Sequence, residues 1–178
     1  MSRMTGGGMG YEIGRMTHRC AATDRPLTPG EPFVAALFEQ AGSELLERRD
    51  YSLEAWEGSA KPKHVFAHWQ GVTPSPDAKP ARLIDDEELV SLFESLDGAE
   101  DAKRQAFRFV LALILARKRL LVDAGRKSSV DGSPSVMLVR KKGALPGEPP
   151  IEVEDPGLDA STIAEVTEQV ASLIRSAS

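Results

Sequence analysis

The feature that most constrains the fold is an uninterrupted apolar run, FVLALILA at 109–116, flanked by Arg108 and by a basic cluster at 117–119. Eight apolar residues without proline or glycine leave no polar face on a helix. At 1.5 Å per residue such a helix spans only about 12 Å, well short of the roughly 30 Å of a bilayer core. The run therefore predicts a helix buried on all sides of a globular domain, where each large side chain contributes roughly 1.5–3 kcal/mol.

Chain length and cysteine usage indicate the class of protein. A chain of 178 residues accommodates one ordinary core with a small appended module. Its single cysteine excludes a disulfide framework and favours a reducing compartment. Residues 1–10 lack the apolar stretch of a signal peptide, so we expect a flexible tail over 1–16 and a cytoplasmic location.

The first part of the chain is expected to be rich in β-structure. Apolar segments at 32–39 and 43–49 flank a Gln-Ala-Gly sequence at 40–42, a pattern typical of a β-hairpin. A third strand is expected at 63–69. These strands define a β-rich, knuckle-like module at 17–73, which a proline-rich linker at 74–82 separates from the rest.

The remainder, 83–178, is expected to form an α+β core. Asp85 and Glu88 form a capping-box pattern at the start of one helix, and Ile84 and Leu89 occupy the positions of a hydrophobic staple. A second helix should begin near Asp101 and contain the apolar run. A β-meander (120–122, 136–139 and 151–154) and a terminal helix capped by Asp159 follow. The fold class is therefore α+β, with an N-terminal β-hairpin module, a helical middle with one fully buried helix, and a C-terminal β-meander and helix.

The segment around Cys20 resembles a known type of module. The sequence CAATDRPLTPGE at 20–31 is similar to the first knuckle of treble-clef and zinc-ribbon modules, and SLEAW at 52–56 has the spacing and the tryptophan of the second C-x-x-C-W pair. Thr23, Ser52 and Ala55 stand where three of the four ligands would be. The resemblance covers residues 20–56 and implies a knuckle-and-hairpin scaffold that has lost its metal. The whole chain otherwise resembles small conserved bacterial proteins more than any named enzyme family.

A different metal site is an open alternative. His18 and Cys20, and likewise His64 and His68, would each lie on one face of an extended strand. Four such ligands could form a tetrahedral zinc site if the two strands met. Their spacing matches no established pattern, so we expect neither a metal nor any other cofactor.

Catalytic motifs are missing from the sequence. It contains no G-x-S-x-G, Walker loop, G-x-G-x-x-G or H-E-x-x-H. Carboxylates at 85–88 fit the first turn of a helix without a catalytic role. We expect a non-catalytic protein, and the enzyme alternative is a small hydrolase or thiol-dependent enzyme centred on Cys20 with His64 or His68.

Charge is distributed unevenly. Residues 117–142 hold eight Lys or Arg against two Asp, a sum of +6, whereas 143–178 sum to −6. The trio Arg140, Lys141 and Lys142 could contact nucleic-acid phosphates, but no aromatic residue lies between 117 and 142. We favour the interpretation that the acidic stretch 148–159 neutralises this basic segment internally.

The leading functional hypothesis is therefore a cytosolic protein that binds another macromolecule, most simply another protein. The expected contact residues are aromatic, because aromatic side chains anchor interfaces; they are Tyr51, Trp56 and Trp69. The rival from another class is an RNA- or ribosome-associated protein that uses the basic segment 117–142. Oligomeric state and the identity of the partner do not follow from the sequence.

Overall fold

The computed structural model describes residues 16–42, 46–58, 61–77, 84–128 and 130–174. The predicted tail and most of the predicted linker lie outside these residues, apart from Met16 and the exposed residues 74–77. The predicted α+β class is confirmed by two three-stranded antiparallel sheets and four helices among the described residues. The elements in chain order are β1 (Pro32–Glu39), β2 (Leu46–Ser52), α1 (Leu53–Glu57), β3 (Ala67–Val72), α2 (Asp86–Ser95), α3 (Ala102–Arg117), β4 (Leu121–Lys127), β5 (Val136–Lys141), β6 (Ile151–Glu154) and α4 (Ala160–Ile174).

The first sheet has the strand order β2-β1-β3, with antiparallel neighbours. Its central strand is buried on both faces from Phe33 to Phe38, which is the burial expected of a continuous apolar run. The predicted third strand begins at Ala67 instead of residue 63, because His64 has a left-handed φ of 60° that interrupts extended backbone. Helix α1, which directly follows β2, was not predicted.

Helices α2 and α3 begin where the local sequence predicts. Asp85 and Glu88 form a complete capping box at the start of α2, and Asp101 caps α3 through the Arg104 amide. Most of the apolar run of α3 is buried, and Leu111 and Leu115 are fully so. Leu113 and Ile114 on the same run are half-buried. No helix of the described residues is both long and apolar enough to cross a membrane.

The second sheet has the order β4-β5-β6 and is the predicted C-terminal meander. Strand β4 extends to Lys127, and its register with β5 shifts at a bulge between Asp123 and Gly125. Gly125 adopts a φ of 115°, a conformation that favours glycine. Met137, Val139 and Val153 are buried on one face of this sheet.

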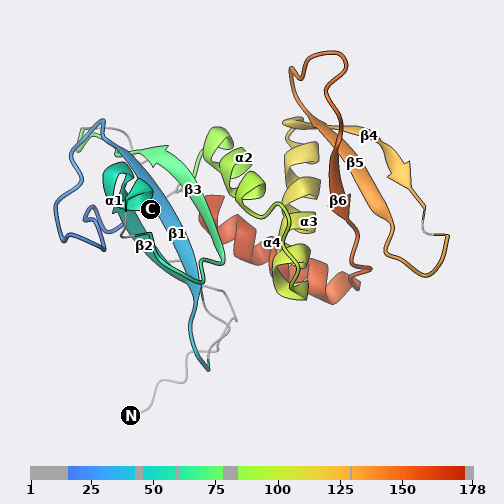
Figure 1. The fold of residues 1–178 in the computed structure, drawn as a ribbon, viewed down its shortest axis with the longest axis horizontal. Coiled ribbons are helices and arrows are strands. Elements are labelled where there is room, and N and C mark those ends of the chain that lie inside the picture. The colour runs from blue at the N-terminus through green and yellow to red at the C-terminus, as the bar shows by residue number, and fades with distance from the viewer. Residues whose placement is uncertain (1–15, 43–45, 59–60, 78–83, 129, 175–178) are drawn as a thin grey trace, which may run out of the picture.

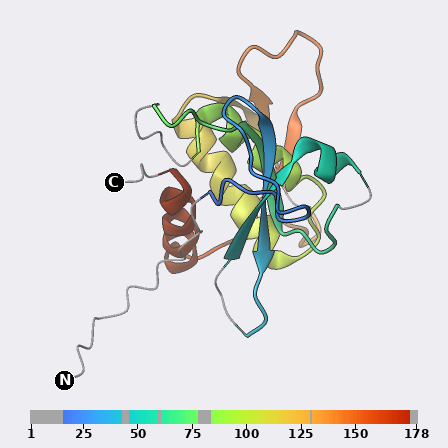
Figure 2. The same ribbon diagram turned by 90° about the vertical axis from the view of Figure 1, so that its left-hand side faces the viewer.

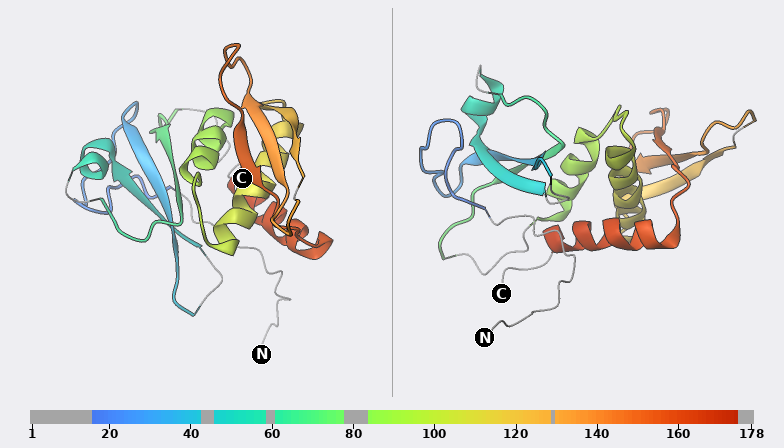
Figure 3. Two further views of the ribbon diagram at one scale, coloured as in Figure 1. Left: turned by 45° about the vertical axis from the view of Figure 1, so that its right-hand side comes forward. Right: turned by 90° about the horizontal axis from the view of Figure 1, so that it is seen from below.

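The two sheets lie on opposite sides of a pair of helices. Figure 1 shows the first sheet on the left, α2 and α3 in the middle and the second sheet on the right. Figure 2 views the same arrangement from the side of the first sheet, with the helices behind it. Helix α4 runs across α3 and packs against it, as the view from below in Figure 3 shows. Buried side chains from both sheets and from α2, α3 and α4 belong to a single hydrophobic cluster.

Helix α2 covers the outer edge of strand β3. The backbone amides of His68 and Gln70 donate to the hydroxyls of Ser95 and Ser91, at 3.1 and 3.2 Å. These serines are four residues apart, so they share one face of the helix. The α2–β3 seam therefore gives hydrogen-bond partners to amides that an edge strand would leave unpaired, and it joins the predicted module at 17–73 to the predicted core at 83–178.

Candidate functional site

The loop that contains Cys20 is a tight turn fastened to strand β2. The Cys20 amide donates to the Arg25 carbonyl, and the Asp24 amide donates back to the Cys20 carbonyl, both at 2.8 Å. The Ala21 amide donates to the carbonyl of Asp50 on β2 at 2.7 Å. This loop therefore holds Cys20 beside the end of β2, where α1 begins.

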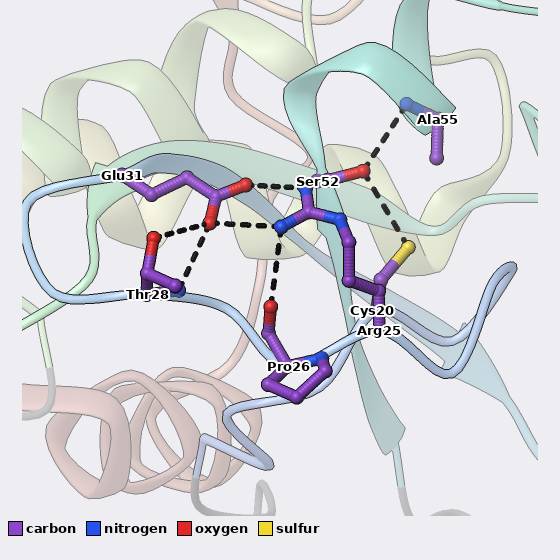
Figure 4. A network of polar contacts seen from close by, with 7 residues as sticks. All are labelled: Cys20, Arg25, Pro26, Thr28, Glu31, Ser52 and Ala55. Carbon is purple, nitrogen blue, oxygen red and sulfur yellow. Dashed lines mark hydrogen bonds and ion pairs between the residues drawn. The ribbon is translucent and has the colours of Figure 1, made fainter.

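The side chain of Ser52 links Cys20 to α1. Ser52 is the N-cap of α1 and accepts a hydrogen bond from the Ala55 amide at 3.3 Å. Its Oγ donates to the Cys20 Sγ at 3.6 Å, and Figure 4 shows both contacts. Burial raises the pKa of the Cys20 thiol, but hydrogen bonds from Thr23 and Ser52 outweigh that effect and lower the pKa to about 7. Cys20 is thus a buried thiol whose charged form is stabilised by the residues around it.

A second polar cluster fixes the end of the same loop. The Arg25 guanidinium donates to both carboxylate oxygens of Glu31, and the amide and hydroxyl of Thr28 donate to Glu31 Oε2 (Figure 4). The hydrogen bond from Arg25 is the main cause that holds the pKa of Glu31 down at about 2. These contacts orient the loop and leave Glu31 without spare acceptor capacity for chemistry.

The alternative metal ligands do not converge. His18 and His64 are exposed and have left-handed φ values of 56° and 60°. Cys20 is buried beside Ser52, and His68 is half-buried against the indole of Trp56, with ring centroids 5.0 Å apart. Among the residues that the structure describes, no group of three or more His, Cys, Asp or Glu side chains is placed to hold a metal ion. The four-ligand site of the alternative hypothesis is therefore not formed.

The three aromatic residues expected at a contact surface are all buried. Tyr51 and Trp56 are 4% and 7% exposed, and their ring centroids are 5.6 Å apart. Trp69 is fully buried beneath the guanidinium of Arg48 and packs in the core. Trp56 nevertheless lines a surface cleft.

That cleft lies on the outer face of the first sheet, which we call the outer-face cleft. It has a volume of about 370 Å³, within the range of small ligand sites. Side chains from β1, α1, β3 and α2, together with Lys61, form its walls; the lining residues are Val34, Leu53, Trp56, Glu57, Lys61, His68, Gln70 and Ser91. Two residues of the sequence analysis, Trp56 and His68, therefore meet in one place.

Polar groups of the outer-face cleft are largely free to interact with a ligand. The side chains of Glu57, Lys61, His68 and Gln70 make no hydrogen bond or ion pair with other described residues. The ammonium of Lys61 lies 5.3 Å from the ring centroid of Trp56. Sequence reasoning missed Glu57, Lys61 and Gln70. The spacing of His68 and Gln70, which places both side chains on one face of a strand, is a signal that could have indicated Gln70.

One cation of the basic trio is paired within the fold, and the other two have no ion pair among the residues that the structure describes. Lys141 forms an ion pair with Glu94 of α2, whereas Arg140 and Lys142 have no ion pair with the described residues. Arg140 and Lys141 line a second cleft of about 470 Å³ between α2, α3 and β5, which also holds Asp97 and Arg108, themselves paired at 2.8 Å. The acidic stretch 148–159 does neutralise part of the basic segment, through pairs of Arg126 and Lys127 with Asp155 and Glu152. Among the described residues, this stretch forms no ion pair with the trio, although Glu148 lines the same cleft as Arg140 and Lys141.

No protein family model, curated protein or solved structure matches this chain.

The Cys20 thiol predicts a specific pH dependence of stability. Its folded pKa of about 7 lies below the ordinary value of 9.0, so the folded state binds fewer protons between these pH values. The free energy of unfolding should therefore rise with pH from about 7 to 9, by at most about 2–3 kcal/mol, and this contribution should be lost as the pH falls through 7. Urea unfolding of the wild type and of Cys20→Ser, compared at each pH, measures it. Parallel pH profiles of the two proteins would contradict the assignment.

Proposed function

We propose that the chain is a non-catalytic protein that binds another protein, and that the outer face of the first sheet is its contact surface. The observation that carries the proposal is the outer-face cleft, in which four polar side chains lie around Trp56 and form no side-chain hydrogen bond or ion pair with the described residues. Three of these side chains, Glu57, Lys61 and Gln70, are exposed, so a partner can reach them. Accessible polar groups gathered around an aromatic side chain are an arrangement that the side chains of a partner protein can complete.

An exposed apolar residue extends the same surface. Val72 at the end of β3 is 62% exposed and lies two residues from Gln70, so both side chains project from the same face of the strand. A valine in this position adds apolar area beside the cleft. The combination of a central aromatic residue, polar groups and a peripheral apolar side chain supports a protein partner.

The geometry around Cys20 gives little support to a thiol-dependent enzyme. Neither His64 nor His68 hydrogen-bonds Cys20 in the part of the chain that the structure describes. A nucleophilic thiol needs a base within hydrogen-bond reach and access to substrate, but Cys20 is only 1% exposed. Its hydrogen bonds from Ser52 and Thr23 instead fasten the loop to α1.

Ion pairing weakens the nucleic-acid alternative. Four of the eight cations of the basic segment have carboxylate partners among the described residues; the pairs are Lys118–Asp86, Arg126–Asp155, Lys127–Glu152 and Lys141–Glu94. Binding to phosphates would have to displace these carboxylates. The protein partner is therefore the better-supported hypothesis.

Capture of partners from a native lysate of the source cells tests the proposal with two matched valine variants. Val72→Asp places a charge beside the outer-face cleft. Val122→Asp alters a valine of the second sheet that is comparably exposed, since Val72 is 62% exposed and Val122 is 53% exposed. We expect recovery of the partner to fall about tenfold for Val72→Asp, or about 1.4 kcal/mol. It should be unchanged for Val122→Asp, and both variants should keep the melting temperature of the wild type.

Nuclease treatment and a third variant separate the two kinds of partner. Recovery that survives nuclease and depends on Val72 supports the proposal. Recovery abolished by nuclease, and by replacing Arg140, Lys141 and Lys142 with Gln, would overturn it in favour of RNA binding. In that case the dependence on salt should also be steep, with a log–log slope of about −0.7 per phosphate on single strands.

We also propose that the Cys20 loop derives from a four-ligand metal site. The resemblance places Cys20, Thr23, Ser52 and Ala55 at the ligand positions. In the structure the Cys20 thiol is hydrogen-bonded to Ser52 and Thr23. The hydroxyl of Ser52 also accepts a hydrogen bond from the Ala55 amide. The separation of 3.6 Å between Cys20 Sγ and Ser52 Oγ supports this origin. Two thiolates about 2.3 Å from a tetrahedral zinc ion are separated by about 3.8 Å.

Restoring the thiolates tests this origin. The wild-type protein is expected to purify without stoichiometric zinc, and a chelator should leave its melting temperature unchanged. The variant Thr23→Cys/Ser52→Cys/Ala55→Cys should bind one zinc ion per chain, and its melting temperature should fall on chelation. Elemental analysis and thermal unfolding measure both. A triple variant that folds yet binds no zinc, or a wild type that carries one zinc per chain, would refute the proposed origin.

A further inference from the structure

Two nitrogen-bearing side chains in the outer-face cleft face the same space and lack an anionic partner. The Lys61 ammonium lies over the Trp56 ring, 5.3 Å from its centroid, and the His68 imidazole lies against that ring at 5.0 Å. Neither group forms an ion pair with a carboxylate among the described residues. The lysine and the histidine therefore contact the same indole and line the same cleft, with no ion pair to a carboxylate among the described residues.

The surroundings of His68 disfavour its positive form. Burial and the nearby Lys61 ammonium lower the pKa of His68 below its ordinary value of 6.5. The other charged group that lines the cleft is Glu57 on α1, which makes no ion pair with either residue. Across the sheet, Arg49 of β2 lies opposite Ala36, the β1 neighbour of His68, but it is paired with Glu47 at 3.0 Å.

We propose that the outer-face cleft binds a carboxylate group of the partner protein, from an Asp or Glu side chain, between Lys61 and His68. This inference rests on the proposed function, since it identifies the group that the contact surface recognises. A carboxylate there would pair with the Lys61 ammonium and accept a hydrogen bond from the imidazole, while the methylene groups of the side chain pack on Leu53 and Val34.

Binding of a carboxylate should be linked to protonation of His68. An anion in the cleft offsets the repulsion from Lys61 and so favours the imidazolium. By linkage, the protonated protein must then bind the carboxylate more tightly than the neutral protein does. If the bound carboxylate raises the pKa of His68 by about one unit, the two affinities differ by about tenfold.

NMR titration of the full chain with sodium propionate, at pH 5.5 and 7.5 and constant ionic strength, tests the inference. Propionamide, which has the same shape without the charge, is the control probe. We expect the Trp56 indole and His68 signals to shift and saturate with propionate, at lower concentrations at pH 5.5, and to stay still with propionamide. Lys61→Gln and His68→Gln should weaken this response, and Glu57→Gln should strengthen it by removing a repulsive charge.

Lys63→Gln is the matched control, since Lys63 is an exposed lysine two residues from Lys61 that does not line the cleft. It should respond to propionate as the wild type does. Equal responses to propionate and propionamide, or a response that survives both Lys61→Gln and His68→Gln, would overturn the carboxylate site. If partner capture still depended on Val72, the contact surface would stand and only its recognised group would be wrong. Loss of the Val72 dependence alongside a saturable propionate response would instead refute the protein-binding function and leave a small-anion site.

Discussion

The arrangement of this protein depends on the α2–β3 seam. Strand β3 is an edge strand, and its amides need acceptors that no further strand supplies. Ser91 and Ser95 supply them from one face of α2. Close approach at the seam also favours Gly71, because a Cβ there would lie 2.0 Å from Glu88 Oε1 and 3.1 Å from Phe33 Cε1, so both side chains would have to move. The carboxyl group of Glu88 is partly buried at the seam, and this desolvation raises its pKa.

The seam lies between the two faces of the first sheet, one of which packs in the core and the other of which carries the outer-face cleft. On the inner face of the first sheet, Arg48 and Asp50 form a buried ion pair at 2.9 Å, and Asp50 also accepts a hydrogen bond from the Thr17 amide. Buried ion pairs add little net stability. Asp50 of this pair also connects the chain around Cys20 to β2, because it accepts hydrogen bonds from the amides of Thr17 and Ala21. On the outer face, Ser91 both accepts from the Gln70 amide and lines the outer-face cleft. One helix therefore closes the sheet edge and forms part of the cleft wall.

Features that depend on neighbouring residues could be predicted from the sequence. The capping box of Asp85 and Glu88 spans four residues, and Ile84 and Leu89 beside it are buried as a hydrophobic staple requires. Helix α1 could not be predicted because five residues are too few to show a helical period. The seam and the outer-face cleft could not be predicted either. They join residues more than 20 positions apart, such as the backbone amide of Gln70 and the hydroxyl of Ser91, through pairing that no local pattern specifies.

The β-rich module at 17–73 and the α+β core at 83–178, which a proline-rich linker divides in the sequence, share one hydrophobic cluster and meet at the α2–β3 seam. Equilibrium urea unfolding tests this coupling directly when it is followed by both tryptophan fluorescence and circular dichroism, because the two signals report on different parts of the chain. Both tryptophans, Trp56 and Trp69, belong to α1 and the first sheet, whereas far-ultraviolet circular dichroism is dominated by α2, α3 and α4. We predict that fluorescence and dichroism give one coincident transition, as a single cooperative unit requires. Two transitions with separate midpoints would show that the halves unfold independently and would contradict the central role of the seam.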